Sequence, residues 1–439
     1  MERRQWRPML ERWSEDWISA RRSGPGPPLD EEVVRTGWLG FEPATPERIA
    51  EAQERLGCTL PPSLREFFLV TDGWRDAGPF VYGLAGTGEI GWLRDLDAHW
   101  IDSFGEAYDD GADDEWAVSP LLRRSLQIST DGDLTVLFLD PEDVNEAGEW
   151  AAYQLSSWSG MGPERYESFR ELMYDLFVSV HRLERPQGTT RRELEAEVEQ
   201  ARLAALHGEV DGPLETFTEA ARFGHEQAEL MQVQMQIMLG EMHAPSRLAP
   251  PAVGREPLTR HPMFERELLP LLLTEQLRSE VGLPVSQNVI RSPDHHKHPP
   301  AQMLPLQQMI ADYRAKTRRT DFRLDFGEPT FDRAVQTVLG RLRQAPAIRD
   351  REGFVQPRPR SIYPFPTVGE SMLPVHSVGP AAQEALDQAW QELRAAIPLW
   401  RPLSHDHIAP IILRADPLLT LMITPERGRE ILAIPRSGQ

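Results

Sequence analysis

Large apolar residues recur at spacings of three and four near the start of the chain: Trp6, Leu10, Trp13 and Trp17. This spacing places them on one side of an α-helix and predicts a helix that docks on a core. A Gly- and Pro-rich run at 23–28 breaks the chain after it. We therefore assign residues 1–36 to an N-terminal helix and linker.

Two short amphipathic helices are predicted next. The first begins after the N-cap Thr45 and ends at Gly57. The second begins at Pro61-Pro62, and Thr71-Asp72-Gly73 turns the chain after it. Each helix has an inward apolar face, formed by Ile49, Ala52 and Leu56 in the first and by Leu64, Phe67 and Phe68 in the second.

Further along, the apolar pattern changes from helical to extended. Two β-rich runs at 126–130 and 135–139 flank Asp131-Gly132, which is a strong signal for a β-hairpin. Another strand is predicted at 150–155. A closing helix is predicted from apolar residues at helical spacing: Phe169, Leu172, Met173, Leu176 and Val180. The order helix, helix, strands, helix is an α+β pattern without alternating βαβ units.

The second half of the chain has weaker signals. Residues 190–243 predict a hairpin of two helices broken at Asp211-Gly212-Pro213. The spacing is similar to a tetratricopeptide-type pair, with Gly208 and Gly224 at turn positions, and a single such pair is expected to cap or dock on a neighbour. Residues 244–305 are Pro-rich and predict a linker with some local structure. The last region, 306–439, predicts a smaller helical or α+β module with two amphipathic helices, one bearing Phe331, Val335, Val338 and Leu342 and the other Leu386, Trp390, Leu393 and Ile397.

Charge is concentrated in the N-terminal part. The net charge is -21, and residues 76–160 hold 18 Asp or Glu against Arg94, Arg123 and Arg124. This net charge of -15 repels nucleic acid and anionic membranes, so neither is an expected partner. A basic protein is the natural complement, although acidic surfaces also serve solubility alone.

The composition indicates a cytoplasmic protein. No apolar run approaches the ~18 residues that a bilayer span needs, and Met1–Trp6 contains no apolar signal core. The single cysteine, Cys58, cannot form an internal disulfide and is expected to be a small buried residue.

Several short runs match the residue pattern of a known functional motif, but the elements predicted around them do not fit that motif. Gly86 to Gly91 matches a dinucleotide fingerprint, yet no strand and helix of a βαβ unit flank it. His295, His296 and His298 have no cysteine nearby, so a polar loop is favoured over a zinc site. His405-Asp406-His407 precedes a turn into packed structure. With neither a Walker loop nor a Gly-x-Ser-x-Gly elbow, we expect no catalysis, cofactor or metal.

The two short helices and the hairpin carry a family resemblance. The run 48–68, the motif Thr71-Asp72-Gly73-Trp74 and later elements such as Leu139-Asp140-Pro141 resemble the SUKH superfamily, also called the Smi/Knr family, over about 37–182. The resemblance implies an α+β domain with one strongly bent sheet and flanking helices. It also implies that bacterial members are immunity proteins that bind toxins, often nucleases. For fungal members it implies a role in cell-wall signalling through protein contacts.

These observations together predict a binding protein whose acidic domain masks a cognate basic toxin, a nuclease being one class that the resemblance implies. The expected contacts are an acidic loop and aromatic anchors: Asp109, Asp110, Asp113, Asp114, Glu115, Trp100 and Trp116. Core burial is the alternative for the tryptophans and is favoured for Trp92. The alternative function is an interaction scaffold or regulator in cell-envelope signalling. An enzymatic site in 306–439 is disfavoured because no catalytic constellation is visible there.

Overall fold

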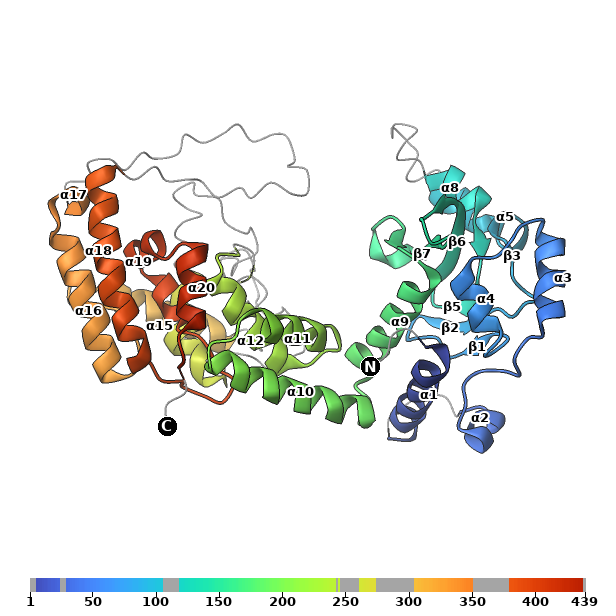
Figure 1. Cartoon of the computed structure of the whole chain (residues 1–439), viewed down its shortest axis with the longest axis horizontal. Helices are drawn as coiled ribbons and strands as arrows, with labels where there is room; N and C mark the ends of the chain where they lie inside the picture. Colours follow the sequence, from blue (N-terminus) through green and yellow to red (C-terminus); the bar gives the residue numbers. More distant parts are fainter. Residues whose placement is uncertain are drawn as a thin grey trace. The chain divides into compact units, whose positions relative to one another are not determined.

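The computed structural model describes residues 5–23, 29–105, 118–241, 244, 260–273, 304–349 and 379–436 (Figure 1). The chain divides into two compact units. The first comprises Met1–Glu195 and Arg222–Gly224, and the second comprises Ala196–Ala221 and His225–Gln439. The first unit combines helices with two antiparallel sheets, which confirms the predicted α+β class.

The two sheets of the first unit contain eight described strands. One sheet has the order β1-β2-β5, and the other has the order β3-β4-β6-β7-β8. Every pairing is antiparallel. The strands are β1 (Trp74–Arg75), β2 (Val81–Leu84), β3 (Gly91–Trp92), β4 (Leu126–Gln127), β5 (Ser129–Gly132), β6 (Thr135–Val144), β7 (Trp150–Ser156) and β8 (Glu164–Tyr166).

The structure differs from the predicted hairpin at 126–139 in one respect. The run predicted as its first strand is split into β4 and β5. Strand β4 pairs with β6, whereas β5 pairs with β2 in the other sheet. At the point of transfer, the amide of Leu137 donates to Ser129 Oγ at 3.0 Å rather than to a backbone carbonyl. A side chain thus replaces a ladder bond where the chain passes from one sheet to the other.

The helices of the first unit begin and end where the caps predict. Thr45 Oγ1 accepts a hydrogen bond from the amide of Arg48 at 3.3 Å, and Gly57 ends the helix at φ 70°, a conformation that glycine adopts without steric cost. The helices before the sheets are α1 (Trp6–Ser23), α2 (Glu31–Thr36), α3 (Pro46–Leu56) and α4 (Pro62–Phe68). Those among and after the strands are α5 (Leu93–Leu96), α6 (Ala98–Trp100), the π-helix η1 (Ile101–Gly105), α8 (Val118–Arg124), the 3₁₀ turn η3 (Ser157–Ser159) and α9 (Phe169–Glu184).

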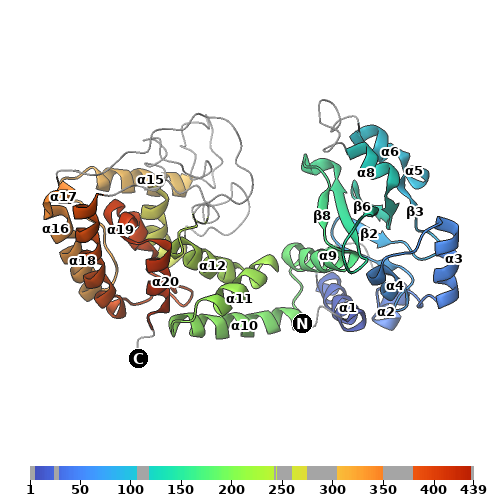
Figure 2. The same cartoon turned by 45° about the horizontal axis from the view of Figure 1, so that its top comes forward.

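Helix α1 is part of the main core of the first unit. Its four-residue stripe is almost fully buried, as predicted. The ring of Trp6 lies 5.3 Å from that of Phe67 on α4, and the ring of Trp13 lies 5.5 Å from that of Phe177 on α9. Figure 2 shows α1 beside α9. The N-terminal helix is therefore integral to this core rather than an appendage.

Strand β6 belongs to two cores at once. Leu137 and Leu139 pack into the main core with α1, α4 and α9, whereas Val136 and Phe138 pack into a second cluster with residues of α5, α6 and α8. All residues from Thr135 to Asp140 are buried. This explains why the run is apolar without alternation, since both sheet faces are covered.

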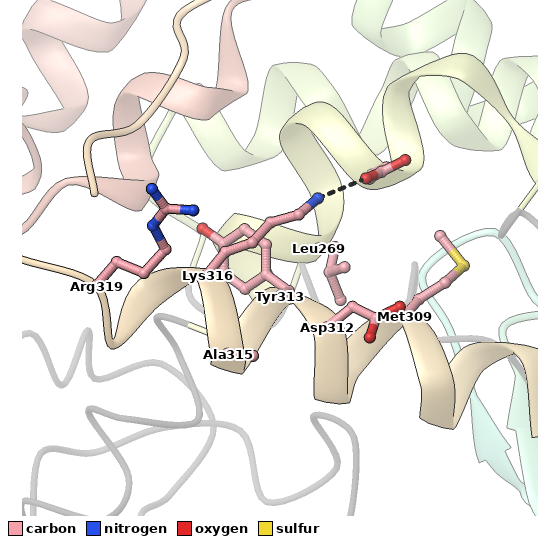
Figure 3. A pocket seen from close by; sticks show the side chains of 8 residues that line it. Leu269, Met309, Asp312, Tyr313, Ala315, Lys316 and Arg319 are labelled. Carbon is pink, nitrogen blue, oxygen red and sulfur yellow. Dashed lines mark hydrogen bonds and ion pairs between the residues drawn. The ribbon is translucent and has the colours of Figure 1, made fainter. Parts of the chain in front are cut away.

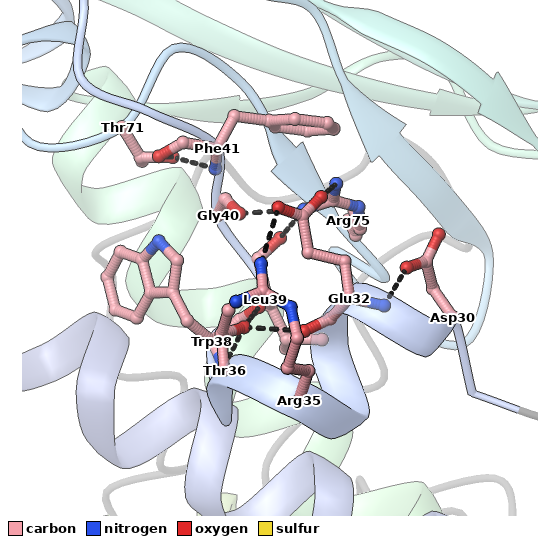
Figure 4. A network of polar contacts seen from close by, with 10 residues as sticks. All are labelled: Asp30, Glu32, Arg35, Thr36, Trp38, Leu39, Gly40, Phe41, Thr71 and Arg75. Carbon is pink, nitrogen blue, oxygen red and sulfur yellow. Dashed lines mark hydrogen bonds and ion pairs between the residues drawn. The ribbon is translucent and has the colours of Figure 1, made fainter.

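The segment from α2 to residue 41 is held against β1 by Arg75 (Figure 4). Arg75 Nη1 donates to the carbonyl of Gly40 at 2.7 Å, and Nη2 donates to Glu32 at 3.0 Å. The same guanidinium lies 3.8 Å from the ring centroid of Phe41. One arginine therefore joins a helix, an extended segment and a strand.

Every regular element described in the second unit is a helix. The region predicted as two helices forms three, α10 (Thr189–Leu206), α11 (Asp211–Arg222) and α12 (Glu226–Met238), so the two-helix prediction was wrong. The breaks fall at Gly208, with φ 100°, and Gly224, with φ 77°. Pro213 lies in the first turn of α11, where a missing amide costs little, and does not end a helix.

A buried helical segment lies inside the predicted linker. Residues 262–273 are helical, including the π-helix η5 (Phe264–Leu268), and Met263, Phe264 and Leu272 are fully buried. The proline content of 244–305 gave no sign of this packed element.

The remaining helices include the two predicted amphipathic ones, whose apolar faces are buried. They are α15 (Leu304–Thr317), α16 (Pro329–Gln344), α17 (Pro346–Arg349), α18 (Pro380–Ala396), η8 (Ile397–Leu399), η9 (Ile411–Ala415), α19 (Pro417–Met422) and α20 (Pro425–Ala433). None of the described helices has the length and apolar composition needed to span a membrane.

Candidate partner-binding surface

The predicted acidic loop joins η1 to α8. Asp109, Asp110, Asp113, Asp114, Glu115 and Trp116 lie outside the described residues. Trp100 is described: it is 8% exposed and stacks on Phe104, with ring centroids 5.0 Å apart. This burial fits the core alternative for Trp100, and a direct partner contact by this residue stays a prediction. Trp92 is partly buried against the main core.

The residues that flank the loop are fixed to the sheet. Ile101 before it and Val118 and Leu122 after it are buried in the second cluster with Phe138 of β6. The described residues on both sides of 106–117 therefore pack on the same face of the sheet.

Two arginines organise the acids of β6. Arg124, at the end of α8, pairs through Nε and Nη2 with both carboxylate oxygens of Asp140, at 2.8 and 2.7 Å. Its Nη1 lies 3.3 Å from Glu142, whose side chain is 69% exposed. The hydrogen bond to Asp140, outweighing the opposite effect of burial, raises the pKa of Arg124. The buried acid of the Leu139-Asp140-Pro141 motif is therefore neutralised, while Glu142 still faces solvent.

The second arginine, Arg165 on β8, binds Asp143 and Glu167. Its Nε and Nη2 donate to Asp143 at 2.7 and 3.0 Å, and Nη1 donates to Glu167 at 2.6 Å. These hydrogen bonds raise the pKa of Arg165, and the one from Arg165 lowers the pKa of Asp143. Burial and the charge of Asp143 raise the pKa of Tyr153, which donates to that carboxylate, to about 12.

Neither arginine was singled out from the sequence. A usable signal existed, because Arg124 and Arg165 are consecutive cations with eight acids between them. These two arginines were therefore the nearest candidates in sequence to pair with an acid buried in that interval. Pairing between a helix end and a strand, however, depends on strand register, which the sequence did not provide.

The Thr71-Asp72-Gly73-Trp74 motif is structural. Asp72 accepts hydrogen bonds from the amide and hydroxyl of Thr87 at 2.6 and 3.1 Å. Thr71 Oγ1 accepts from the amide of Phe41 at 2.8 Å, and Trp74 is fully buried. The fingerprint-like run at 86–91 is thus a turn braced by Asp72 that leads from β2 to β3, which belong to two different antiparallel sheets. This is the wrong setting for a dinucleotide.

In the second unit, His407 is buried in a fixed tautomer. The amide of Leu403 donates to His407 Nδ1 at 2.9 Å, so the proton resides on Nε2, which lies 3.0 Å from the carbonyl of Ala409 and 3.1 Å from Glu267. Both ring nitrogens are engaged within the core. His407 therefore joins two segments and has no open position for a ligand.

Asp406 pairs with His261, whose Nε2 lies 2.9 Å from Oδ1. Ser404 Oγ donates to the same carboxylate at 2.7 Å. In a serine nucleophile triad the histidine must lie between the serine and the acid. Here the acid lies between them, so this cluster has a structural arrangement. Within the described ranges, no three His, Cys, Asp or Glu side chains are grouped as metal ligands; His295, His296 and His298 lie outside those ranges.

A cavity of about 520 Å³ lies beside α15 (Figure 3). Its walls contain two acids, Glu265 and Asp312, and two cations, Lys316 and Arg319. Lys316 pairs with Glu265 at 3.2 Å, and Arg319 pairs with Asp321 at 2.8 Å. These balanced charges point to no particular ligand.

Comparison with known families assigns part of the chain. Residues 43–175 match the SMI1 / KNR4 family (SUKH-1), which confirms the predicted resemblance for this region. The match begins just before α3 and ends within α9, so it lies in the first unit. It is consistent with a protein-binding module of the immunity type. Neither a curated protein nor a solved structure gives a significant match to the chain.

Proposed function

We propose that the first unit is a non-catalytic protein-binding module that neutralises a cognate basic toxin, with nucleases as the first class to test. The observation that carries this proposal is the SUKH-1 match over residues 43–175. Bacterial proteins of this family are expected, from the resemblance, to act as immunity proteins. The domain would act by occupying the toxin surface, without chemistry of its own.

The charge of the domain supports a basic partner. An enzyme that cleaves nucleic acid must hold a polyanion and therefore presents cations around its active site. A surface with a net of -15 over residues 76–160 would compete for those cations and speed encounter. Glu142 and Glu167 each pair with an arginine, but their side chains are 69% and 70% exposed and remain accessible to a partner.

The acidic loop is the proposed centre of this contact. Five acids within seven positions repel one another in the free protein, and a cationic partner would relieve that repulsion. The helices before and after these residues pack into the second cluster, so a rigid base would flank the acids on both sides.

A survival assay tests the proposal. The chain would be co-expressed with the toxin encoded beside its gene, and Asp109, Asp110, Asp113, Asp114 and Glu115 would be replaced together by Asn or Gln. We expect reduced protection with an unchanged or slightly higher melting temperature. A matched control neutralises five acids elsewhere in the unit: Glu42, Glu47, Glu51, Glu54 and Glu89. Full protection by the loop variant would contradict the role of the loop.

The second candidate is an interaction scaffold or regulator in cell-envelope signalling. It is favoured by the second unit, which lies beyond the matched residues and which a simple inhibitor would not need. A neighbouring toxin gene whose product binds the first unit would favour neutralisation. Stable capture of cell-envelope proteins in the absence of a toxin gene would favour the scaffold.

A further inference from the structure

Apolar side chains are exposed together at one end of the sheets. Leu134 is 62% exposed, Trp158 is 54% exposed and Met161 is 70% exposed. Phe80, just before β2, is partly buried, and its ring lies 4.9 Å from that of Trp158. We call these four residues the tip patch. They come from three separate connections, which precede β2, join β5 to β6, and join β7 to β8.

The three connections are bonded to one another. The amide of Asp133 donates to the carbonyl of Phe80 at 2.9 Å, and the amide of Ser157 donates to that of Leu134 at 3.0 Å. Trp158 Nε1 donates to the carbonyl of Asp133 at 3.2 Å. The patch is therefore held in place before any partner arrives, which lowers the entropic cost of binding.

Leu134 has an unfavourable backbone. Its φ is 49°, in the left-handed region that leucine seldom adopts. A glycine or asparagine would take this conformation more easily, and the leucine gains no burial in return. A strained residue with an exposed apolar side chain indicates a role outside folding.

The surroundings of the patch are acidic. Asp131, Asp133 and Glu164 are exposed beside it, and no Lys or Arg occurs between Arg124 and Arg165. Apolar anchors within a rim of one charge suit a partner that combines apolar side chains with the opposite charge. A membrane surface with anionic lipids would be repelled.

We propose that the tip patch is a docking site for a basic protein segment with aromatic or aliphatic anchors. The proposal deepens the proposed protein-binding function, and it names a contact distinct from the acidic loop. Trp158 is the main anchor on this side, because Trp is enriched among the residues that dominate binding energy. Leu134 is the second, because it is exposed on a strained backbone. The patch lies at the Thr135 end of β6, whereas the Asp140 ion pair lies toward its other end.

The test uses the full chain and a displayed library of random 12-residue peptides. We expect enriched peptides to contain at least two Lys or Arg with an aromatic or aliphatic residue. Leu134→Asn and Trp158→Ala should each weaken their affinity at least tenfold. Leu69→Asn is the control, because Leu69, the residue that follows α4, is 49% exposed and lies outside the patch. Leu134→Asn should also keep or raise the melting temperature, since asparagine tolerates the backbone angle.

The outcomes separate this inference from the proposed function. Enrichment of no peptide, or of peptides that bind the two variants as tightly as the wild type, overturns the docking site while leaving toxin neutralisation intact. Self-association that Leu134→Asn abolishes would assign the patch to a second copy of the chain and also overturn it. Peptide binding that depends on Leu134 and Trp158 supports the inference even where no toxin is neutralised.

Discussion

Arg124 and Asp140 form a bidentate ion pair in which the arginine is one-third exposed and the aspartate is fully buried. Because of this asymmetry, a substitution of the arginine should cost more stability than a substitution of the aspartate. Removing Arg124 leaves a carboxylate without its counter-charge in the interior, beside the second cluster.

We therefore expect Arg124→Met to lower the free energy of unfolding by about 3 kcal/mol. Urea denaturation followed by tryptophan fluorescence would measure it. Arg35→Met is the control, because Arg35 pairs with Glu32 on an exposed helix face and should change stability by less than about 0.5 kcal/mol. Equal effects of the two substitutions would contradict the importance of the buried pair.

Association with a basic partner should depend on salt. Raising ionic strength from about 0.05 to 0.5 M shortens the Debye length well below 10 Å and screens the acidic surface. We expect the association rate constant to fall at least tenfold, with a smaller change in the dissociation rate constant. Surface plasmon resonance with the captured toxin would measure both. A rate indifferent to salt would refute electrostatic steering.

Asp406 should make the second unit sensitive to acid. Burial alone would raise the pKa of Asp406, but the hydrogen bonds from His261 and Ser404 prevail and lower it to about 2. Since the folded pKa lies below the unfolded value, this carboxylate contributes stability above about pH 4, and the contribution is lost as the pH falls toward 2.

We expect Asp406→Asn to cost about 1–2 kcal/mol at pH 6 and almost nothing at pH 2. Denaturation of both proteins across this range would show the two stability curves converging at low pH. Glu384→Gln, which changes an exposed carboxylate on α18, should show no such convergence. A constant difference at every pH would mean that Asp406 acts through packing alone.

Arg436 should be essential for the second unit. It is 1% exposed and donates to five carbonyls, those of Ala205, Ile408, Ile431, Leu432 and Ile434. Burial lowers its pKa to about 10, so it is still charged at neutral pH. We expect Arg436→Leu to cost about 3 kcal/mol, because the carbonyls lose their donors.

Hydrogen exchange would locate this loss. Amides near the end of α10 and in α20 should exchange faster in Arg436→Leu, because both helix ends lose the same side chain. Arg429→Leu, which removes an exposed pairing with Asp211, is the control and should leave exchange unchanged. Faster exchange confined to α20 would show that the contact with Ala205 is dispensable.

Cys58 offers a clean reporter for the first unit. Burial raises the pKa of its thiol, and it is the only cysteine in the chain. We expect alkylation in the native protein at pH 7 to be at least tenfold slower than that of a free cysteine peptide, since the thiolate is the reactive form. The rate should approach the peptide value in denaturant. Native labelling as fast as the peptide would contradict the partial burial of the thiol.

The helices that the sequence predicted best are those with both a cap and a stripe. Thr45 and Gly57 bound α3, and the spacing of Trp6, Trp13 and Trp17 predicted α1 and its buried face. These signals are local, because they arise from bonds and contacts within a few turns. Local signals also placed α16 and α18 in the otherwise unassigned second half.

What the sequence could not supply was pairing at long range. The run at 126–132 contains no sign that Leu126 and Ser129 belong to different sheets, because that depends on which distant strand each one meets. The ion pair of Arg124 with Asp140 and the exposure of Trp158 likewise depend on which residues of neighbouring strands lie opposite one another. The split at Gly224 was visible as a glycine, but only packing decides whether a glycine ends a helix.

The double burial of β6 has a consequence for how this domain could change partners over time. A substitution between Thr135 and Asp140 disturbs packing on at least one side of the sheet, so drift in the strand is restrained by stability. The connections at its two ends carry no such restraint. New binding specificities can therefore arise by substitutions in these connections while the sequence of β6 is conserved. An immunity protein built this way could keep binding a toxin that changes in sequence, without a change in its own fold.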